Sequence, residues 1–214
     1  KSNNVSNLFL VKKGGKTAEA IALTKLDDAV DKFKWSSQAG EIFFSKDNQG
    51  NENTQIYKLN FTTDNLDKPI QTTRLTHNDK VNYRYIKQVV HSPDTVLVMA
   101  NHSDAKRVDF FHLNLDSQKL SMVQKNEYNF NSMFASKTGE VIVGSALNSD
   151  NSSSLYGKVN NGWSKLITTQ PGESFSILEA DTRSNTAYIS ADIAGRDKKE
   201  LLLLDMVTGK VKTF

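Results

Sequence analysis

A pair of apolar segments recurs four times along the 214 residues of the chain. The first segment of each pair begins at Glu41, Thr95, Glu140 or Thr186. These starts are separated by 54, 45 and 46 residues. The second segments contain Ile56, Phe110, Leu155 and Leu201, which are again 54, 45 and 46 residues apart. Because two series rarely keep step by chance, the sequence predicts one supersecondary unit copied along the chain.

Each pair is flanked by further apolar or β-branched segments. We expect preceding strands at residues 31–36, 83–90, 130–135 and 175–180, and following strands at 70–76, 120–125, 164–169 and 211–214. Gly40 and Gly139 stand where tight turns between strands need a positive φ. Residues 96–100 and 141–146 lack polar alternation, which is typical of a sheet covered on both faces. Four antiparallel strands in about 45 residues match a blade of a β-propeller.

The predicted domain is a single partial β-propeller of about four to five four-stranded antiparallel blades, in the all-β class. Residues 7–13 and 18–24 are interpreted as strands and 26–31 as a loop or short turn. The approximate divisions are a half blade at 1–25 and blades at 26–77, 78–126, 127–170 and 171–214. Because the last blade ends with the chain, no strand is left to complete the half blade. We therefore expect a piece of a longer protein with more blades.

Composition excludes several classes of protein. A net charge of +3, from 27 basic and 24 acidic residues, is too balanced to indicate nucleic acid or an anionic membrane as a partner. No apolar run approaches the 18 residues of a membrane-spanning helix. The absence of Cys excludes disulfides, thiolate metal sites and a Cys nucleophile. We expect a soluble protein of the cytoplasm or the periplasm, since the composition does not decide between them.

The first blade carries a family resemblance. It contains, in order, Phe33-Lys34-Trp35-Ser36, Glu41-Ile42-Phe43-Phe44, Asp47-Asn48-Gln49-Gly50-Asn51-Glu52-Asn53 and Ile56-Tyr57. This order resembles a blade of the prolyl oligopeptidase family of serine peptidases, in its acylaminoacyl peptidase-like branch. Asn51 departs from the Asp that is usual there. Later segments at 92–98, 112–115, 195–197 and 208–209 are similar to the same branch, so the resemblance spans nearly the whole chain.

The resemblance implies a longer enzyme in two parts. In that family an N-terminal propeller covers a C-terminal α/β-hydrolase domain with a Ser-Asp-His triad and filters substrates by size. Only the propeller part is similar to this chain. The implied partners are the hydrolase domain of the same protein and its peptide substrates. No catalytic, cofactor-binding or metal-binding residue can be carried over, so we expect no cofactor and no activity from this chain alone, while the longer protein is a hydrolase.

The residues themselves offer little catalytic chemistry. The fragment nearest to a Gly-x-Ser-x-Gly nucleophile turn is Gly172-Glu173-Ser174-Phe175-Ser176, which lacks the second Gly and leads into a strand. We interpret Ser174 as part of a loop between blades rather than a nucleophile. The four histidines have no metal-ligand spacing, and His112 is expected to pack or point outward. They are His77, His91, His102 and His112.

Two polar segments, residues 47–53 and 148–154, faintly resemble calcium loops but lack the full ligand spacing. We interpret them as hairpin turns, with Glu52 binding backbone amides of the first. An ion pair between Arg196 and Asp197 could order a turn. Arg84, Arg107 or Arg196 would bind substrate only if its loop faced the hydrolase domain.

The aromatic residues are interpreted as packing residues. We expect Trp35 to be buried, and Trp163 to correspond to it only loosely. Tyr57, Phe111 and Tyr156 recur at one position of the repeat, which favours core packing between blades over a ligand cage. Four Asn-x-Ser/Thr sequences, at Asn4, Asn60, Asn101 and Asn151, matter only in a eukaryotic secretory host.

A different class of function stays open. The chain could be a stand-alone propeller scaffold or binding module, similar to the periplasmic TolB-like propellers, with no hydrolase activity. A small glycan- or peptide-binding enzyme is a third possibility, for which no group of residues gives support. In each case exposed blade faces predict self-association or a covering partner.

Overall fold

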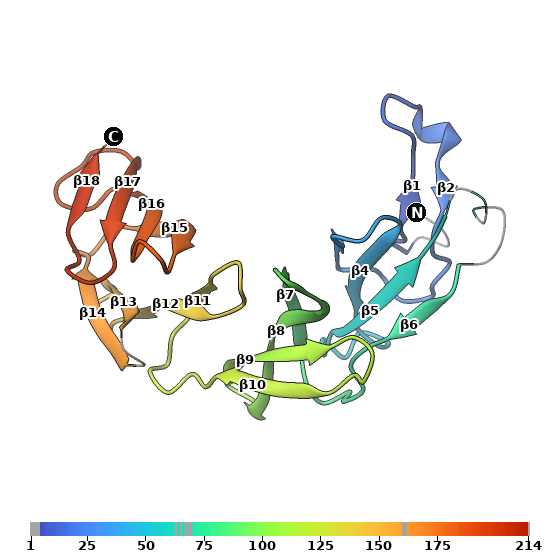
Figure 1. The fold of residues 1–214 in the computed structure, drawn as a ribbon, viewed down its shortest axis with the longest axis horizontal. Coiled ribbons are helices and arrows are strands. Elements are labelled where there is room, and N and C mark those ends of the chain that lie inside the picture. Colours follow the sequence, from blue (N-terminus) through green and yellow to red (C-terminus); the bar gives the residue numbers. More distant parts are fainter. Residues whose placement is uncertain (1–4, 63, 65, 67–69, 160–161, 214) are drawn as a thin grey trace. The chain divides into compact units, whose positions relative to one another are not determined.

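The computed structural model describes residues 5–62, 64, 66, 70–159 and 162–213. Asn4 and the last residue of the predicted strand 211–214 lie outside these residues. The regular secondary structure of the described chain is almost entirely strand (Figure 1), apart from a short 3-10 helix at Thr17–Glu19. It divides into two compact units, Lys1–Met122 and Val123–Phe214, which are described separately below. No helix in the described part is long and apolar enough to cross a bilayer.

The first unit holds a two-stranded sheet and two four-stranded sheets. The strands of the small sheet are β1 (Phe9–Leu10) and β2 (Ile21–Ala22). The next sheet contains β3 (Lys32–Trp35), β4 (Glu41–Lys46), β5 (Gln55–Asn60) and β6 (Thr72–Arg74). The third contains β7 (Tyr83–Val89), β8 (Ser92–Asp104), β9 (Arg107–Asn114) and β10 (Leu120–Gln124), whose last residues reach past the division between the units. In each sheet, strands adjacent in sequence pair antiparallel.

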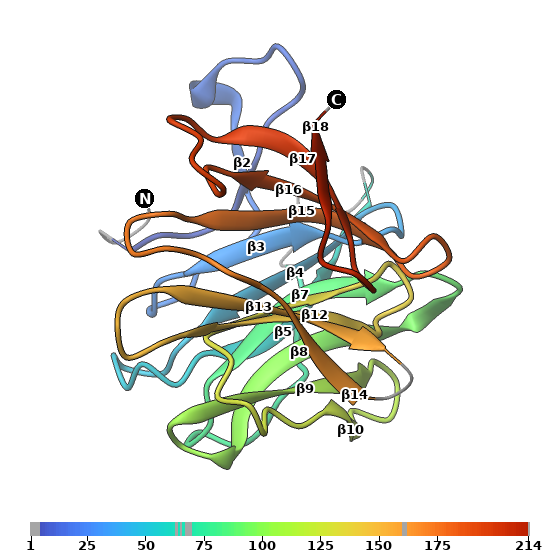
Figure 2. The ribbon, with the colours of Figure 1, turned by 90° about the vertical axis from the view of Figure 1, so that its left-hand side faces the viewer.

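The second unit repeats the same plan twice. Its first sheet contains β11 (Ser132–Ala135), β12 (Val141–Leu147), β13 (Ser153–Val159) and β14 (Gly162–Thr168). Its second contains β15 (Phe175–Asp181), β16 (Thr186–Ala191), β17 (Glu200–Asp205) and β18 (Val211–Thr213), whose twist is visible in Figure 2. Both sheets are antiparallel meanders.

The prediction of an all-β chain of four-stranded antiparallel units is confirmed. Every recurring pair of apolar segments forms two adjacent strands, from β4–β5 to β16–β17. The interpretation of residues 7–13 and 18–24 as strands is wrong in part, because β1 and β2 have only two residues each and the 3-10 helix occupies the start of the second segment. The approximate blade boundaries stay predictions.

The cores lie between sheets that are adjacent in sequence. In the first unit, Phe43 and Ile56 of one sheet share a buried cluster with Val96, Val98 and Phe111 of the next. In the second unit, Val143 and Leu155 share a cluster with Ile189, Leu202 and Leu204. Leu8 and Leu23, which flank the strands of the small sheet, pack against Ile42 and Phe44 of the β3–β6 sheet. Packing of one apolar sheet face on another therefore stabilises both units.

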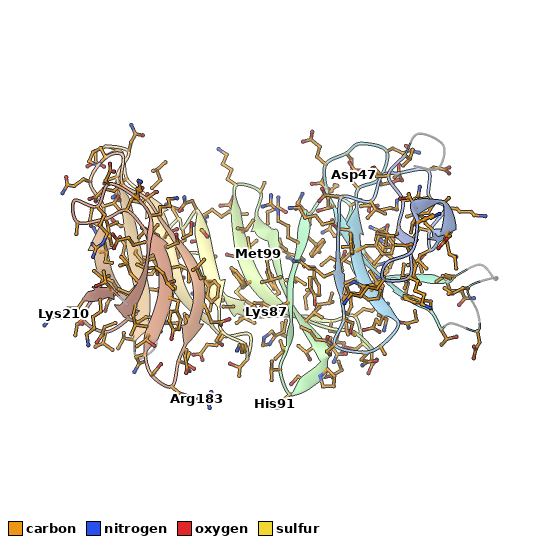
Figure 3. All side chains as sticks on the ribbon, turned by 90° about the horizontal axis from the view of Figure 1, so that it is seen from above. Asp47, Lys87, His91, Met99, Arg183 and Lys210 are labelled. Carbon is orange, nitrogen blue, oxygen red and sulfur yellow. The ribbon has the colours of Figure 1, made fainter. Side chains whose placement is uncertain are left out.

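The turns of each unit lie at opposite edges of the sheets. Figure 3 shows Asp47, in the β4–β5 turn, at one edge of the first unit, and His91, in the β7–β8 turn, at the other. Gly40 confirms the predicted positive φ, with a value of 73°, and Gly139 has 80°. A Cβ atom on Gly40 would lie 2.1 Å from the carbonyl oxygen of Phe61, so glycine is needed there for space as well as for conformation.

Candidate functional site: two equivalent cavities between blades

A cavity of about 420 Å³ lies between the two four-stranded sheets of the first unit. It is called the first cavity below. Its wall comes from the start of β3, the end of β4 and the start of β7, which is the edge of the unit that carries the β4–β5 turn. The residues that matter most to its chemistry are Lys32, Lys34, Phe43, Arg84, Tyr85 and Met99. Its volume lies in the range of small-ligand sites, roughly 300–1,000 Å³.

Strand register places two lysines on the cavity side of the sheet. Lys32 lies opposite Ser45, and Lys34 lies opposite Phe43. Residues paired directly across two antiparallel strands share a face. Since Phe43 faces the β7–β10 sheet, both lysines belong to the same face. β3 is an edge strand, and all four of its residues are exposed, so the ammonium groups stay in contact with water.

The back of the first cavity is aromatic. The rings of Phe43 and Tyr85 stack with centroids 4.9 Å apart and an angle of 19° between their planes. Burial raises the pKa of Tyr85 to about 12, and the nearby charge of Glu41 adds to this, while a hydrogen bond with the Gln88 backbone opposes it. Burial also raises the pKa of Tyr83, against the opposing charge of Arg74. Both phenols therefore remain neutral near pH 7.

The cations of the first cavity are not used in ion pairs. Within the described part of the chain, the cations of the ion pairs are Lys46, Lys58, Arg74, Arg107, Lys125, Arg183 and Arg196. Lys32, Lys34 and Arg84 are not among them. The Nε of Arg84 lies 3.4 Å from the amide oxygen of Asn82. Asp31 also lines the cavity, and the charge of Glu41 acts on Tyr85 at its back. Arg84 lies opposite Met99 of β8, on the other face of the sheet from Tyr83 and Tyr85.

The second unit has a cavity of about 350 Å³ at the equivalent place, between β11–β12 and the start of β15. It is called the second cavity. Ser132 lies opposite Ser145 and Phe134 opposite Val143, as Lys32 and Lys34 lie opposite Ser45 and Phe43. Ser176 takes the place of Arg84, because each is the second residue of its strand. The same backbone arrangement therefore holds hydroxyl and apolar groups here, and cations in the first unit.

Ser174 lies just before β15, in agreement with its interpretation as a loop residue. Its hydroxyl is 3.3 Å from each carboxylate oxygen of Asp192, and its backbone N–H also donates to that carboxylate. These hydrogen bonds hold the pKa of Asp192 below its usual value, with the backbone donor as the largest cause. The pair ties the start of β15 to the end of β16.

The four histidines are dispersed. His77 binds the side chain of Gln118 at 2.8 Å, and His91 occupies the β7–β8 turn with a φ of 70°. His102 packs its ring at 5.8 Å from Phe111. His112 lies in β9 and is partly buried, with no hydrogen bond at Nε2 within the described residues. A group of three or more possible metal ligands is absent from the same residues.

The side chains of Asp47 and Asn51, rather than the predicted Glu52, hold the polar turn at residues 47–53. Asp47 accepts the N–H of Glu52 at 3.0 Å, and Asn51 accepts the N–H of Asn53 at 3.0 Å. Glu52 contributes its backbone carbonyl to Asn82 instead of a carboxylate. The role proposed for the Glu52 side chain is therefore wrong. Asp47 and Asn51 act because their short side chains reach the backbone two to five residues ahead.

The second polar turn, at residues 148–154, is closed by its own side chains. Asp150 accepts the hydroxyl of Ser152 at 2.6 Å and its N–H at 3.0 Å. These two bonds, the hydroxyl first, lower the pKa of the Asp150 carboxyl. Asn148 binds the hydroxyls of Ser152 and Ser154. The carboxylate oxygens are thus used within a turn, in agreement with its interpretation as a hairpin.

The predicted ion pair between Arg196 and Asp197 is wrong. The Nε of Arg196 donates to the Oε2 of Glu200 at 3.0 Å, and its Nη1 donates to the carbonyl oxygen of Ile193 at 2.9 Å. The long arginine side chain spans the turn more readily than it folds back on the adjacent residue. Arg107 pairs with Asp104 at 2.9 Å across the β8–β9 turn.

The expected burial of Trp35 is also wrong, since 54% of its surface is exposed. Trp35 ends the edge strand β3, which no further strand covers, and its ring lies 6.0 Å from that of Phe61. Trp163 is the better packed of the two, at 4.8 Å from Phe130. The packing interpretation holds for Tyr57, stacked on Phe44, and for Phe111, which is buried. Tyr156 packs at 5.2 Å from Phe130.

Of the four Asn-x-Ser/Thr sequences, those at Asn60, Asn101 and Asn151 lie in the described part.

The sequence analysis did not single out Lys32 or Tyr85 as site residues, and it assigned no binding role to Lys34. The available signal was the alternation Lys32-Phe33-Lys34-Trp35, which puts both cations on one face of an edge strand.

No family model matches the sequence. A dipeptidyl aminopeptidase BIII of Pseudoxanthomonas mexicana is 24% identical over 185 residues, which is 82% of this chain and 25% of that protein. A structure of prolyl oligopeptidase B from Galerina marginata, bound to a 35-residue substrate, has a TM-score of 0.62 and 12% identity. It matches 94% of this chain and 28% of its own.

The chain has the β-propeller fold of these peptidases. The predicted resemblance is thus supported by structural neighbours and by a weak sequence match. TolB from Acinetobacter baumannii has the same fold, with a TM-score of 0.56 and 12% identity over 96% of this chain and 48% of its own. The chain therefore spans only a quarter to a half of the length of these three proteins.

Proposed function

We propose that this chain is the non-catalytic propeller portion of a prolyl oligopeptidase-family serine peptidase. In this proposal it controls the access of peptides to an α/β-hydrolase domain elsewhere in the longer protein. One observation carries the proposal: a dipeptidyl aminopeptidase aligns with 82% of this chain but only over 25% of its own length. The structural neighbours among peptidases show the same disproportion. Such a match is expected when one domain of a two-domain enzyme is compared with the whole.

The control of access would be steric. In a propeller the blades surround a central channel. In this proposal one edge strand of each sheet borders the channel, since the edge strands β3 and β6 are largely exposed while β4 between β3 and β5 is buried. A ring of packed blades is stiff, so it would admit short or unfolded peptides and exclude folded proteins.

The experiment compares the 214-residue chain with the longer protein of its reading frame on aminoacyl- and acyl-peptide chromogenic substrates. We expect hydrolysis and labelling by a fluorophosphonate probe for the longer protein alone. A graded series of peptides and a folded protein then tests the size filter, with cleavage expected to stop at folded substrates. Turnover by the 214-residue chain itself, or a longer protein that the probe does not label, contradicts the proposal.

A second candidate function is a scaffold or binding propeller without hydrolase activity. It is favoured by the structural match to TolB, which covers 96% of this chain. The two candidates differ in one measurable respect. A scaffold predicts a longer protein with no Gly-x-Ser-x-Gly segment after the propeller and no reaction with the probe.

A further inference from the structure

The first cavity combines positive charge with an aromatic wall. Lys32 and Lys34 lie on the face of β3 that borders it, and Arg84 and Asp31 are also among the residues that line it. The charge of Glu41 acts on Tyr85 at its back. Phe43 and the neutral Tyr85 form the apolar side. A ligand that fits both halves carries an anionic group within a few ångströms of an apolar one. A peptide carboxylate beside an apolar side chain has this form.

The cations are not required by the packing of the two sheets. The second cavity is formed by the same register, with Ser132, Phe134 and Ser176 in the places of Lys32, Lys34 and Arg84. Its walls pack without any of these charges. No carboxylate of the described residues lies within 4 Å of these basic side chains, so an arriving anion does not have to break an ion pair with one of them.

We propose that the first cavity binds a peptide carboxylate whose neighbouring side chain is apolar, through Lys32 and Lys34, with the side chain against Phe43 and Tyr85. The carboxylate is the C-terminal group or that of an acidic residue. This inference rests on the proposed function in one respect, the choice of a peptide as the ligand. It adds to the size filter a preference for peptides that carry a carboxylate, because the cavity is lined by basic side chains.

The test measures binding to the 214-residue chain by isothermal titration calorimetry with three probes. They are acetyl-Ala-Ala-Phe with a free carboxylate, the same peptide with a C-terminal amide, and acetyl-Ala-Glu-Phe with a C-terminal amide. We expect the free acid, the Glu peptide or both to bind at least tenfold more tightly than the neutral amide, since hydrogen bonds to charged groups contribute that much. Which of the two binds identifies the source of the carboxylate. Equal binding of all three probes, or none, overturns the proposal.

Two variants assign the binding to this cavity. Lys32→Ser with Lys34→Phe copies the second cavity, and we expect it to lose the preference for the carboxylate. Lys106→Ser with Lys119→Ser removes the same charge from exposed positions outside the cavity and should leave binding unchanged. Circular dichroism confirms that both variants are folded. If both lose binding equally, the effect is one of net charge and the proposal fails.

The result is separable from the proposed function. Peptidase activity is measured on the longer protein, whereas binding is measured on this chain without turnover. If the longer protein hydrolyses peptides but this chain shows no preference for the carboxylate, the proposed size filter is supported and the proposed ligand site in the first cavity is contradicted.

Discussion

Phe43 of β4 stacks on Tyr85 of β7, with 4.9 Å between ring centroids, and so joins two sheets that are adjacent in sequence. Phe43 belongs to the core cluster of the first unit, and Tyr85 is partly buried and packs against that cluster. The contact closes the back of the first cavity. It therefore links the stability of the blade pair to the site that we assign to a ligand.

The stacked pair predicts a pH dependence at alkaline pH. The pKa of Tyr85 is about 12 in the folded chain, against about 10 in an unfolded one. Between these values the folded state keeps a proton that the unfolded state has released. The contribution of Tyr85 to the free energy of unfolding is therefore constant below pH 10 and falls as the pH rises toward 12. Urea unfolding at pH 8, 10 and 11 should show a smaller fall for Tyr85→Phe. Parallel curves for the two proteins would contradict this assignment.

Glu41 predicts the cost of an uncompensated buried charge. Its side chain is buried, and its Oε2 lies 3.4 Å from the ammonium of Lys58. Lys58→Met should lower the free energy of unfolding by about 3 kcal/mol, because the carboxylate is left buried without its partner. Adding Glu41→Gln to that variant should restore part of the loss. Chemical denaturation at pH 7 measures both, and a double variant no more stable than Lys58→Met would argue against the pair.

Two glycines with the same backbone conformation separate strain from steric overlap. Gly40 and Gly50 have φ values of 73° and 76°. An added Cβ would strike the Phe61 carbonyl at Gly40 but meets no atom within 4 Å at Gly50. Gly50→Ala should cost about 1–2 kcal/mol from the left-handed conformation alone, and Gly40→Ala clearly more. Thermal unfolding compares them, and equal losses would show that the turn shifts to accept the methyl group.

The last sheet predicts self-association. One face of β15–β18 is buried in the core of the second unit, whereas Leu201 and Tyr188 project from the other with 50% and 42% of their surfaces exposed. Uncovered apolar sheet faces favour association. We expect the 214-residue chain to form concentration-dependent oligomers in analytical ultracentrifugation, and Leu201→Lys with Tyr188→Lys to reduce them. Lys212→Ser, on the edge strand β18, serves as the control. A monomer at all concentrations would contradict the prediction.

Local sequence determined the number and order of the strands. Apolar β-branched and aromatic runs, separated by Asn, Asp and Gly, specify hairpins because each signal acts within a few residues. This is why the recurring pairs were placed correctly, while residues 18–24, with their weak pattern, were not. Gly40 could likewise be assigned from its turn alone.

Only the tertiary structure decided which side chains face which neighbour. Tyr57 pairs with Phe44, but Tyr156 pairs with Gly144, one residue later than the sequence repeat aligns. A shift of one residue turns a strand's side chains to the opposite face, and the neighbouring pairing contains such a shift between Phe134 and Ala135. The exposure of Trp35 and the meeting of Lys34 with Tyr85 at one cavity also depend on sheet edges and on residues about 50 positions apart. No local pattern records these contacts, because they arise only when one blade packs on the next.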